Sequence, residues 1–372
     1  MIQVGAGAMG RTWLALLEES PDVELVGLVD LDLASARAGL AAIGRTDVAI
    51  GTSTSEVARR TEAQAVVDVT VPSAHHSVNL EALLAGLPVL CEKPIAPTLS
   101  QALSLAAASE ASGQLLMISQ SRRYYDALAE SKRLCAVLGD IGIIRTDYFM
   151  APRFGGFRDW MDYPLLSDMA IHPFDVARYL LDDEPVRVYC DSFNPSWSWY
   201  AGHAACNASF EFSNGARFFY TGSWCSSGFE TSWNGSWRLN GSLGSLLWDG
   251  ESRPAVDVQV VGPVGEPVHS DEAIAGSLAE YIDALRTGRV PSGEVHSNIF
   301  SLAMVEGAIV SARQGRPVDL AAVFDDAFLI ALQDEANQEV KSRLKSWSDR
   351  PEPLFTYLRG AVLRVEQIGN HR

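Results

Sequence analysis

Hydrophobic and polar positions follow two different patterns along this chain. Up to about Ser119, short apolar runs of strand length alternate with segments of helical periodicity. From about Gly142 to Val261 the chain is rich in β-branched and aromatic residues, and Ala208–Tyr220 alternates in character around a turn at Asn214-Gly215. Alternating βα units followed by a strand-rich region predict an α/β part and then an α+β part.

Helical periodicity returns in the C-terminal third. It covers Asp271–Arg286 and Ser297–Arg313, and the last fifty residues are also helical, with a break at Ser348–Pro353. We therefore predict three parts, with boundaries at residues 1–120, 121–320 and 321–372. The third part is expected to be a helical extension that serves packing or oligomer formation.

Composition narrows the class of protein. Hydrophobic residues make up 47% of the chain and charged residues 20%, which is enough for a sizeable core. The net charge of -17 argues against nucleic acid or an anionic membrane as partner. No window is expected to reach the roughly 20 apolar residues of a membrane span, and no signal peptide is expected. The five cysteines form no CxxC pair, so we expect reduced thiols and a cytoplasmic location.

A glycine motif opens the chain. Gly5, Gly7 and Gly10 form G-x-G-x-x-G between the apolar run Ile2–Val4 and a helical pattern. The first glycine permits a tight turn, the second lets a pyrophosphate approach the backbone, and the third lets helix and strand pack closely. The helix N-terminus then offers N–H groups to the phosphates. This arrangement predicts a dinucleotide-binding Rossmann domain over residues 1–120.

An acidic residue stands where such a domain contacts the ribose. Asp30 ends the second apolar run, twenty residues after Gly10. A carboxylate here accepts hydrogen bonds from the ribose hydroxyls and repels a 2′-phosphate, and Leu31 offers no compensating cation. We therefore expect NAD as the cofactor, with NADP less favoured.

Two further predicted strands, Ala63–Val71 and Leu87–Pro94, end in polar residues. Ligands bind at the carboxyl ends of strands in an open parallel sheet. Lys93, at the end of the second of these strands, is thus expected at the cofactor edge. The residues expected to contact the cofactor are Gly5, Ala6, Gly7, Ala8, Met9, Gly10, Asp30, Thr70, Val71, Pro72, Ser73, His75, Glu92 and Lys93.

The stretch Tyr163–Leu180 carries Asp168, His172 and Asp175 at helical spacing, which puts them on one face of a helix. Pro173 interrupts this pattern, so the helix either begins near His172 or bends there. Asp175 either fixes the tautomer of the imidazole or has a structural role, and the spacing leaves both open.

These motifs in this order resemble the Gfo/Idh/MocA oxidoreductase family. The resemblance rests on G-A-G-A-M-G, on E-K-P about ninety residues in, and on D-x-x-x-H in a later helix, and it covers roughly residues 1–320. It implies a Rossmann domain followed by an α+β domain with a large, mostly antiparallel sheet. It also implies hydride transfer between a nicotinamide cofactor and a sugar, inositol or related polyol.

The resemblance carries the catalytic roles to Lys93, Asp168 and His172. An imidazole titrates near neutral pH and suits His172 as the base, while the Lys93 cation stabilises a developing alkoxide. The family's arginine after the sixth strand falls on Arg123, with Arg122 as its neighbour, and its histidine after the fourth strand is either His75 or His76. This sequence departs from the family's pattern at two places: Ser73 replaces a frequent asparagine, and "YPLLSD" replaces the usual glycines. The residues expected to bind substrate are Arg123, Trp160, Tyr163, Asp168 and His172.

The substrate half contains many tryptophans, most of which we expect to pack a sheet. The segment Ala151–Trp160 combines glycines, arginines and aromatics and is expected to form a loop over the site, where Arg153 and Arg158 either grip an anionic group or are solvated. We expect no metal site, because no HxxxH or CxxC pair is present. A homodimer or homotetramer is expected to form through the sheet of residues 121–320.

Two other functions share this fold. A non-catalytic NAD-binding regulator would lack the lysine or the histidine, and both are present. An NAD-dependent glycosidase would cleave a glycoside without net formation of NADH. Turnover with a panel of inositols, aldoses and sugar acids distinguishes these from a dehydrogenase.

Overall fold

The computed structural model describes residues 1–258 and 271–369, with side chains described up to residue 361. Backbone contacts divide the chain into two compact units. The first unit comprises Met1–Gln120, Ile274–Ile299 and Asp325–Arg372, and the second comprises Ser121–Ala273 and Phe300–Phe324. The later helices thus return to the first unit instead of following the second in sequence order.

The first unit is built on a six-stranded sheet whose described strands are all parallel. The strand order is β3-β2-β1-β4-β5-β6, which is the order of a dinucleotide-binding Rossmann fold. The strands are β1 Ile2–Val4, β2 Gly27–Val29, β3 Ala49–Gly51, β4 Val66–Asp68, β5 Val89–Glu92 and β6 Leu116–Ser119. The α/β prediction for this part is confirmed.

Helices connect these strands and begin at polar caps. The side chains of Asp32, Ser53 and Thr98 accept backbone N–H groups at the starts of α2, α3 and α5. The connecting helices are α1 Ala8–Glu19, α2 Leu33–Ala42, α3 Thr54–Thr61, α4 Pro72–Leu84 and α5 Leu99–Ser112. The later helices of the chain are α8 Ala273–Thr287, α9 Val295–Gln314, α10 Leu320–Asp334, α11 Gln338–Ser348 and α12 Leu354–Gly369.

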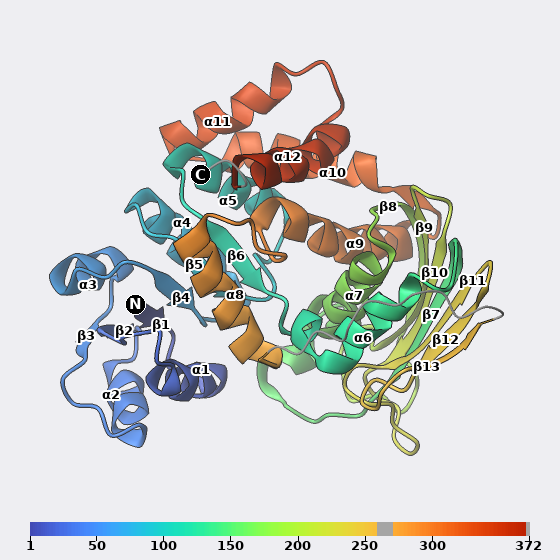
Figure 1. Ribbon diagram of the computed structural model, residues 1–372, viewed down its shortest axis with the longest axis horizontal. Coiled ribbons are helices and arrows are strands. Elements are labelled where there is room, and N and C mark those ends of the chain that lie inside the picture. The colour runs from blue at the N-terminus through green and yellow to red at the C-terminus, as the bar shows by residue number, and fades with distance from the viewer. Residues whose placement is uncertain (259–270, 370–372) are drawn as a thin grey trace. The chain divides into compact units, whose positions relative to one another are not determined.

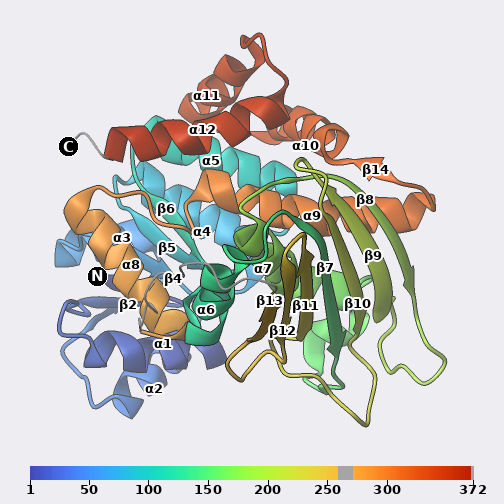
Figure 2. The same cartoon turned by 45° about the vertical axis from the view of Figure 1, so that its right-hand side comes forward.

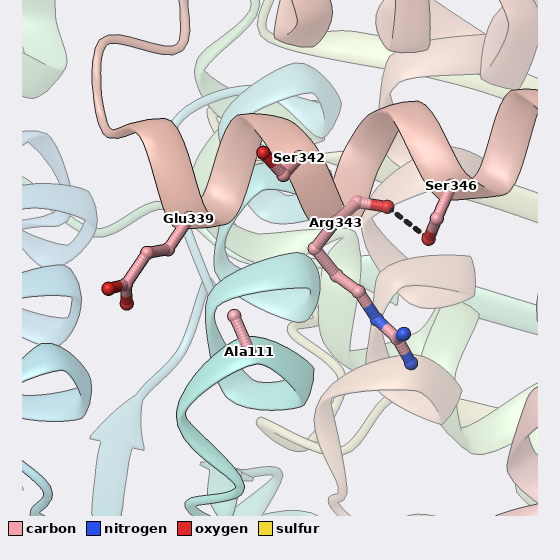
Figure 3. Close-up of a pocket in the computed structure, with 5 residues that line it drawn as sticks. All are labelled: Ala111, Glu339, Ser342, Arg343 and Ser346. Atoms are coloured by element: carbon pink, nitrogen blue, oxygen red, sulfur yellow. Dashed lines mark hydrogen bonds between the residues drawn. The ribbon is translucent and has the colours of Figure 1, made fainter.

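Helix α11 packs against α5, and α12 packs on α11 through Tyr357 and Trp347, whose ring centroids are 6.1 Å apart (Figure 2). Glu110 of α5 accepts hydrogen bonds from His296 Nε2 at 2.9 Å and Trp347 Nε1 at 3.0 Å, and it also pairs with Arg343 of α11. Between α5 and α11 lies a shallow surface pocket lined by Ala111 and by residues of α11 (Figure 3). The predicted break at Ser348–Pro353 is the connection between α11 and α12.

The second unit is built on an eight-stranded sheet of the described residues, in the order β13-β12-β11-β7-β10-β9-β8-β14. Only β7 and β10 pair in parallel, so the sheet is mostly antiparallel, as predicted. The strands are β7 Ile141–Phe149, β8 Pro185–Phe193, β9 Ala205–Phe212, β10 Arg217–Ser223, β11 Ser236–Gly241, β12 Gly244–Trp248, β13 Ala255–Val258 and β14 Val318–Asp319.

Helices α6 (Asp126–Cys135) and α7 (Ile171–Leu181) lie on one face of this sheet (Figure 1). The core forms where Phe174 of α7 meets inward-facing rings of β9 and β10, with its centroid 4.8 Å from Phe210 and 5.3 Å from Tyr220. Three short helical turns complete the unit: η1 Ser121–Tyr124, η2 Gly156–Trp160 and η3 Leu165–Met169. The predicted turn at Asn214-Gly215 joins β9 to β10, with Gly215 at φ 92°.

By length and composition, α9 is able to cross a membrane, which corrects the expectation that no segment would be so apolar. The relevant window has a mean hydropathy of 1.2, and 72% of it is buried inside the protein. Ile299, Phe300 and Ala303, for example, are fully buried. Packing in a protein interior therefore accounts for the apolar composition of this helix.

Candidate functional site

The glycine motif forms the loop between β1 and α1. Gly5 has φ +99°, and a Cβ atom there would lie 2.6 Å from the carbonyl oxygen of Val69. A Cβ at Gly10 would lie 2.4 Å from the Gly5 carbonyl oxygen, so the helix packs directly against the turn. A Cβ at Gly7, the residue before α1, would have no heavy atom within 4 Å. The loop therefore leaves open space beside Gly7 at the helix N-terminus, as a phosphate-binding glycine motif requires.

Asp30 follows β2 and is oriented by two backbone N–H groups. Its Oδ2 accepts the Ala6 N–H at 2.7 Å and its Oδ1 accepts the Asp32 N–H at 2.8 Å. The neighbouring Leu31 is 89% exposed. A fixed carboxylate next to the glycine loop is the arrangement that favours the ribose hydroxyls of NAD.

The side chain of His75 contacts both the segment that follows β4 and the segment that follows β5. Its ring is fully buried, with Nδ1 2.6 Å from the Pro94 carbonyl oxygen and Nε2 3.1 Å from the Thr70 carbonyl oxygen. His76 instead lies with its Nε2 3.0 Å from the hydroxyl of Ser104. The structure therefore gives His75 a place under the strand ends, while its contact with a cofactor stays a prediction.

Three possible metal ligands meet nearby. The side chains of Asp68, His75 and Cys91 are buried, and their ligating atoms lie within 4.8 Å of one another. Burial raises the pKa of the Asp68 carboxyl and that of the Cys91 thiol. A neutral thiol is a poor ligand, and both imidazole nitrogens already face carbonyl oxygens. This chemistry favours a packed polar cluster.

Glu92 holds the end of β5 in place. Its Oε1 accepts the Trp13 indole N–H at 2.8 Å and its Oε2 accepts the Lys93 N–H at 3.1 Å. Burial raises the pKa of the Glu92 carboxyl. Lys93, which is partly buried, thus starts from a backbone position fixed against α1 at the carboxyl end of the sheet.

In the second unit, Asp168 and His172 belong to one short segment of the chain. Asp168 lies in the π-helical turn η3, and His172 is the second residue of α7. Pro173 is therefore in the first turn of the helix, where its missing N–H costs no hydrogen bond. The prediction that the helix begins near His172 is correct, and the two side chains do not lie on one continuous α-helix.

Asp168 forms an ion pair with Arg158, whose Nε lies 2.6 Å from Oδ2. Arg158 comes from η2, which is preceded by Gly155 and begins at Gly156, with φ 70° and 72° at these two glycines. Its guanidinium also lies over the rings of Phe154 and Phe157, at 5.4 Å and 4.8 Å. The segment Ala151–Trp160 is thus linked to Asp168 by a charged contact within the same unit.

Arg123 and Asp175 form a buried ion pair. Two nitrogens of Arg123 donate to the two oxygens of Asp175 at 2.7 and 2.8 Å, and the hydroxyl of Ser301 donates to the same carboxylate at 2.6 Å. Burial raises the pKa of the Asp175 carboxyl, but the two nearby cations Arg123 and Arg178 more than offset it and leave that pKa below its ordinary value. These contacts support the structural role for Asp175. The assignment of Arg123 to substrate binding stays a prediction, since its side chain is only 9% exposed.

The aromatic residues expected near the substrate differ in exposure. Trp160 is 79% exposed, whereas Tyr163 packs edge-on against His203 at 5.3 Å and lies under Arg313 at 5.4 Å. Arg153 stacks on Trp199 at 3.9 Å. The tryptophans expected to pack the sheet do so at Trp237 and Trp248, while Trp197 and Trp233 are exposed.

Sequence reasoning did not single out Tyr148 or assign a role to Trp224. Both are buried, and their rings stack at 5.8 Å. Tyr148 comes from β7 and Trp224 follows β10, so no sequence spacing brings them together. Only the parallel pairing of these two strands does so.

Two family models match the chain. One describes an oxidoreductase family with an NAD-binding Rossmann fold and matches residues 2–120, and the other describes the GFO/IDH/MocA C-terminal domain and matches residues 136–247. The first unit therefore contains an NAD-binding domain.

Curated relatives include dehydrogenases and reductases. Inositol 2-dehydrogenase 4 of Saccharopolyspora erythraea is 32% identical over 50% of this chain and 54% of its own length. The 1,5-anhydro-D-fructose reductase of Ensifer adhaerens is 24% identical over 85% of this chain and 97% of its own length. An Agrobacterium radiobacter oxidoreductase, solved with NAD+, L-tartaric acid and magnesium, has a TM-score of 0.75 and 19% identity, covering 86% of this chain and 98% of that one.

Proposed function

Because the chain belongs to the Gfo/Idh/MocA family of oxidoreductases, we propose that it transfers a hydride between nicotinamide and a secondary hydroxyl of a sugar, inositol or related polyol. One observation carries this proposal. An acid and an imidazole, Asp168 and His172, leave the same η3–α7 segment of the unit that follows an NAD-binding fold. A partly buried carboxyl and a buried imidazole so close in sequence suit proton transfer, which supports a chemical role for both.

Oxidation of a secondary alcohol requires removal of the hydroxyl proton and stabilisation of the developing alkoxide. We propose that His172 takes this proton and that the ammonium group of Lys93 stabilises the oxygen. Asp168 orients a neighbouring hydroxyl and stabilises the imidazolium. NAD, when bound, supplies the hydride acceptor. The Gly5–Gly10 loop and Asp30 hold its phosphates and ribose.

Turnover of a polyol panel tests this function. With NAD and myo-inositol, aldoses or sugar acids, the absorbance of NADH appears at 340 nm for at least one compound. Lys93→Ala and His172→Ala each lower kcat by about 10²- to 10⁴-fold, as expected for loss of a proton-transfer or charge-stabilising group, and both variants still bind NAD. Lys341→Ala, in α11, is the control and turns over normally. Full activity in His172→Ala would show that another residue is the base.

We also propose a homodimer or homotetramer in the cytoplasm, assembled through the exposed face of the β7–β14 sheet. The register places Tyr189, Phe219 and Leu247 in one row across that face, together with Arg145 and Arg238. The first three are 45%, 41% and 50% exposed. A row of apolar side chains beside charged ones is typical of an interface. Light scattering after gel filtration gives an oligomer for the wild type, and Phe219→Glu shifts it towards the monomer.

A further inference from the structure

Several buried side chains of the second unit carry hydrogen-bond donors that no described residue accepts, among them Tyr148, Trp224 and Tyr220. The hydroxyl of Tyr148 and the indole N–H of Trp224 have no partner in the part of the chain that the structure describes, although both residues are only 1% exposed. By contrast, the hydroxyl of Tyr200 donates to the Pro152 carbonyl oxygen at 3.0 Å. A buried donor without an acceptor costs about 1–3 kcal/mol, so such groups need an explanation.

A third donor, Arg122, lies beside them. Its Nη1 donates to the Trp233 carbonyl oxygen and to Asn234 Oδ1, and its Nη2 is 3.9 Å from the sulfur of Met169. All of these partners are neutral. Burial lowers the pKa of the Arg122 guanidinium to about 10, and the groups that oppose this are phenols, with Tyr148 first among them. No carboxylate among the described residues compensates this cation.

The cluster of Arg122, Tyr148 and Trp224, termed here the donor cluster, adjoins the segment that carries Asp168. A closed series of contacts connects the two within the unit. It runs through Arg122, Met169, Asp168, Arg158, Phe154 and Trp233, and returns to Arg122. Trp224 packs against both Phe154 and Trp233, at 6.4 Å and 6.0 Å.

The nearby carboxylates have other partners. Asp168 and Glu230 both act on the phenol of Tyr148 and, with burial as the main cause, raise its pKa. Asp168 is ion-paired with Arg158, and Glu230 Oε1 accepts the Ala151 N–H at 3.2 Å. The donor cluster therefore offers a cation, an O–H and an N–H, and lacks an acceptor that carries charge.

We propose that the donor cluster binds a carboxylate of the substrate, so that the polyol oxidised by this protein is a sugar acid. The inference rests on the proposed dehydrogenase function and specifies its substrate class. A carboxylate supplies two acceptor oxygens and a single negative charge, which matches one guanidinium and two neutral donors. A phosphate carries up to two charges and would call for a second cation.

Calorimetric titration of the NAD-loaded protein tests this assignment. The probes are aldonic, uronic and aldaric acids, each paired with its neutral parent sugar, together with the corresponding sugar 6-phosphates. At least one acid binds about 10- to 100-fold more tightly than its neutral parent, as expected for charge-assisted hydrogen bonds. Arg122→Met abolishes this preference, and Arg289→Met, an exposed arginine paired with Asp283, leaves it unchanged.

Tyr148→Phe separates ligand binding from a structural role. It removes only the unpartnered hydroxyl, so the thermal midpoint of the unliganded protein stays the same or rises, while the preference for the acid falls several-fold. A structural hydroxyl would lower the midpoint instead. If Arg122→Met does not fold, Tyr148→Phe and Trp224→Phe carry the test, since both preserve the aromatic packing.

Three results overturn the proposal. The first is that no acid binds better than its parent sugar, which would mean that water alone satisfies the donors. The second is that the preference for the acid survives in Arg122→Met and Tyr148→Phe. The third is that sugar phosphates bind better than the acids. If NADH forms from a neutral polyol and no acid is preferred, the carboxylate subsite is wrong but the dehydrogenase function still holds. If an acid binds in a way that depends on Arg122 but no NADH forms, the proposed dehydrogenase function is wrong and the carboxylate subsite still holds.

Discussion

Two arginines that are adjacent in sequence occupy two very different regions of the second unit. Arg123 donates twice to Asp175, and the same carboxylate accepts the hydroxyl of Ser301. Arg122 contacts only neutral groups among the described residues, beside two donors that have no acceptor. The first region is a complete ion-pair network, and the second is a set of donors without an anion. The difference indicates that one region stabilises the fold and the other is arranged for a ligand.

The short helix η1 explains how neighbours separate in this way. Ser121–Tyr124 form a 3₁₀ turn, in which successive side chains point about 120° apart. Arg123 therefore reaches α7, whereas Arg122 reaches the segment between β10 and β11 that carries Trp233 and Asn234. Which arginine meets a carboxylate depends on elements that are distant in sequence.

The largest effect is expected in the complete network. Asp175→Asn keeps the shape of the side chain but leaves Arg123 without its buried carboxylate, while Arg178 keeps its ion pair with Glu184. The free energy of unfolding falls by about 3–5 kcal/mol, as for other buried ion pairs that lose one partner. Urea unfolding measures this, with Asp283→Asn, in an exposed pair with Arg289, as a control that changes it by at most about 1 kcal/mol. Equal stability of Asp175→Asn and the wild type would contradict the role given to this network.

The pH dependence of the same network has a definite sign. The folded-state pKa of Asp175 lies below its unfolded value, so its contribution to stability is complete above about pH 4. It is lost as the pH falls through the depressed folded pKa. Acid unfolding followed by circular dichroism should therefore show a smaller loss of stability below pH 4 in Asp175→Asn than in the wild type. Identical acid sensitivity would count against this.

A complete network in the first unit extends the comparison. Burial lowers the pKa of His296, but Glu294 and Glu110 on either side raise it to about 10 overall. A raised folded pKa means that the stabilisation is full below the unfolded value of about 6.5 and is lost as the pH rises towards 10. Wild-type stability falls over this window by up to about 1.4 kcal/mol per pH unit more than that of His296→Gln. If the stability of the two proteins changed with pH in the same way, His296 would not be protonated in the folded protein.

The smallest effect is expected in the incomplete region. Arg122→Met gives up hydrogen bonds to Trp233 and Asn234 but also removes a partly buried cation that no described carboxylate neutralises. The free energy of unfolding of the unliganded protein therefore changes by no more than about 1 kcal/mol, whereas Arg123→Met lowers it by about 3–5 kcal/mol. The two variants, compared by urea unfolding, form a matched pair. Similar losses in both would erase the distinction between the two regions.

Much of the first unit was predictable because its site is local in sequence. Gly5, Gly7 and Gly10 lie within one turn, and each has the surroundings that its place in the motif requires. Asp30 lies at the end of the adjacent strand, oriented by the N–H of Ala6. Strand boundaries were less accurate: the predicted strand Ala63–Val71 contains the shorter β4, Val66–Asp68. The apolar residues around β4 also pack in loops, which hydrophobicity alone does not distinguish from strand.

The second unit was predictable in class but not in its contacts. Alternation around Asn214-Gly215 identified the β9–β10 hairpin, and Pro173 limited where α7 begins. The spacing of Asp168, His172 and Asp175 suggested one polar face. Instead, Asp168 faces Arg158 and Asp175 faces Arg123, because a π-helical turn precedes the α-helix.

By itself the sequence determined the class of both units, the dinucleotide loop, the acidic residue after β2 and the membership of an oxidoreductase family. These features depend on backbone conformation and on spacings within a few residues, which local sequence controls. Only the tertiary structure decided which of two adjacent arginines is neutralised, and that Tyr148 and Trp224 lie together without an acceptor. The physical reason is that ion pairing and burial depend on which distant strands and helices meet, and no local pattern encodes those contacts.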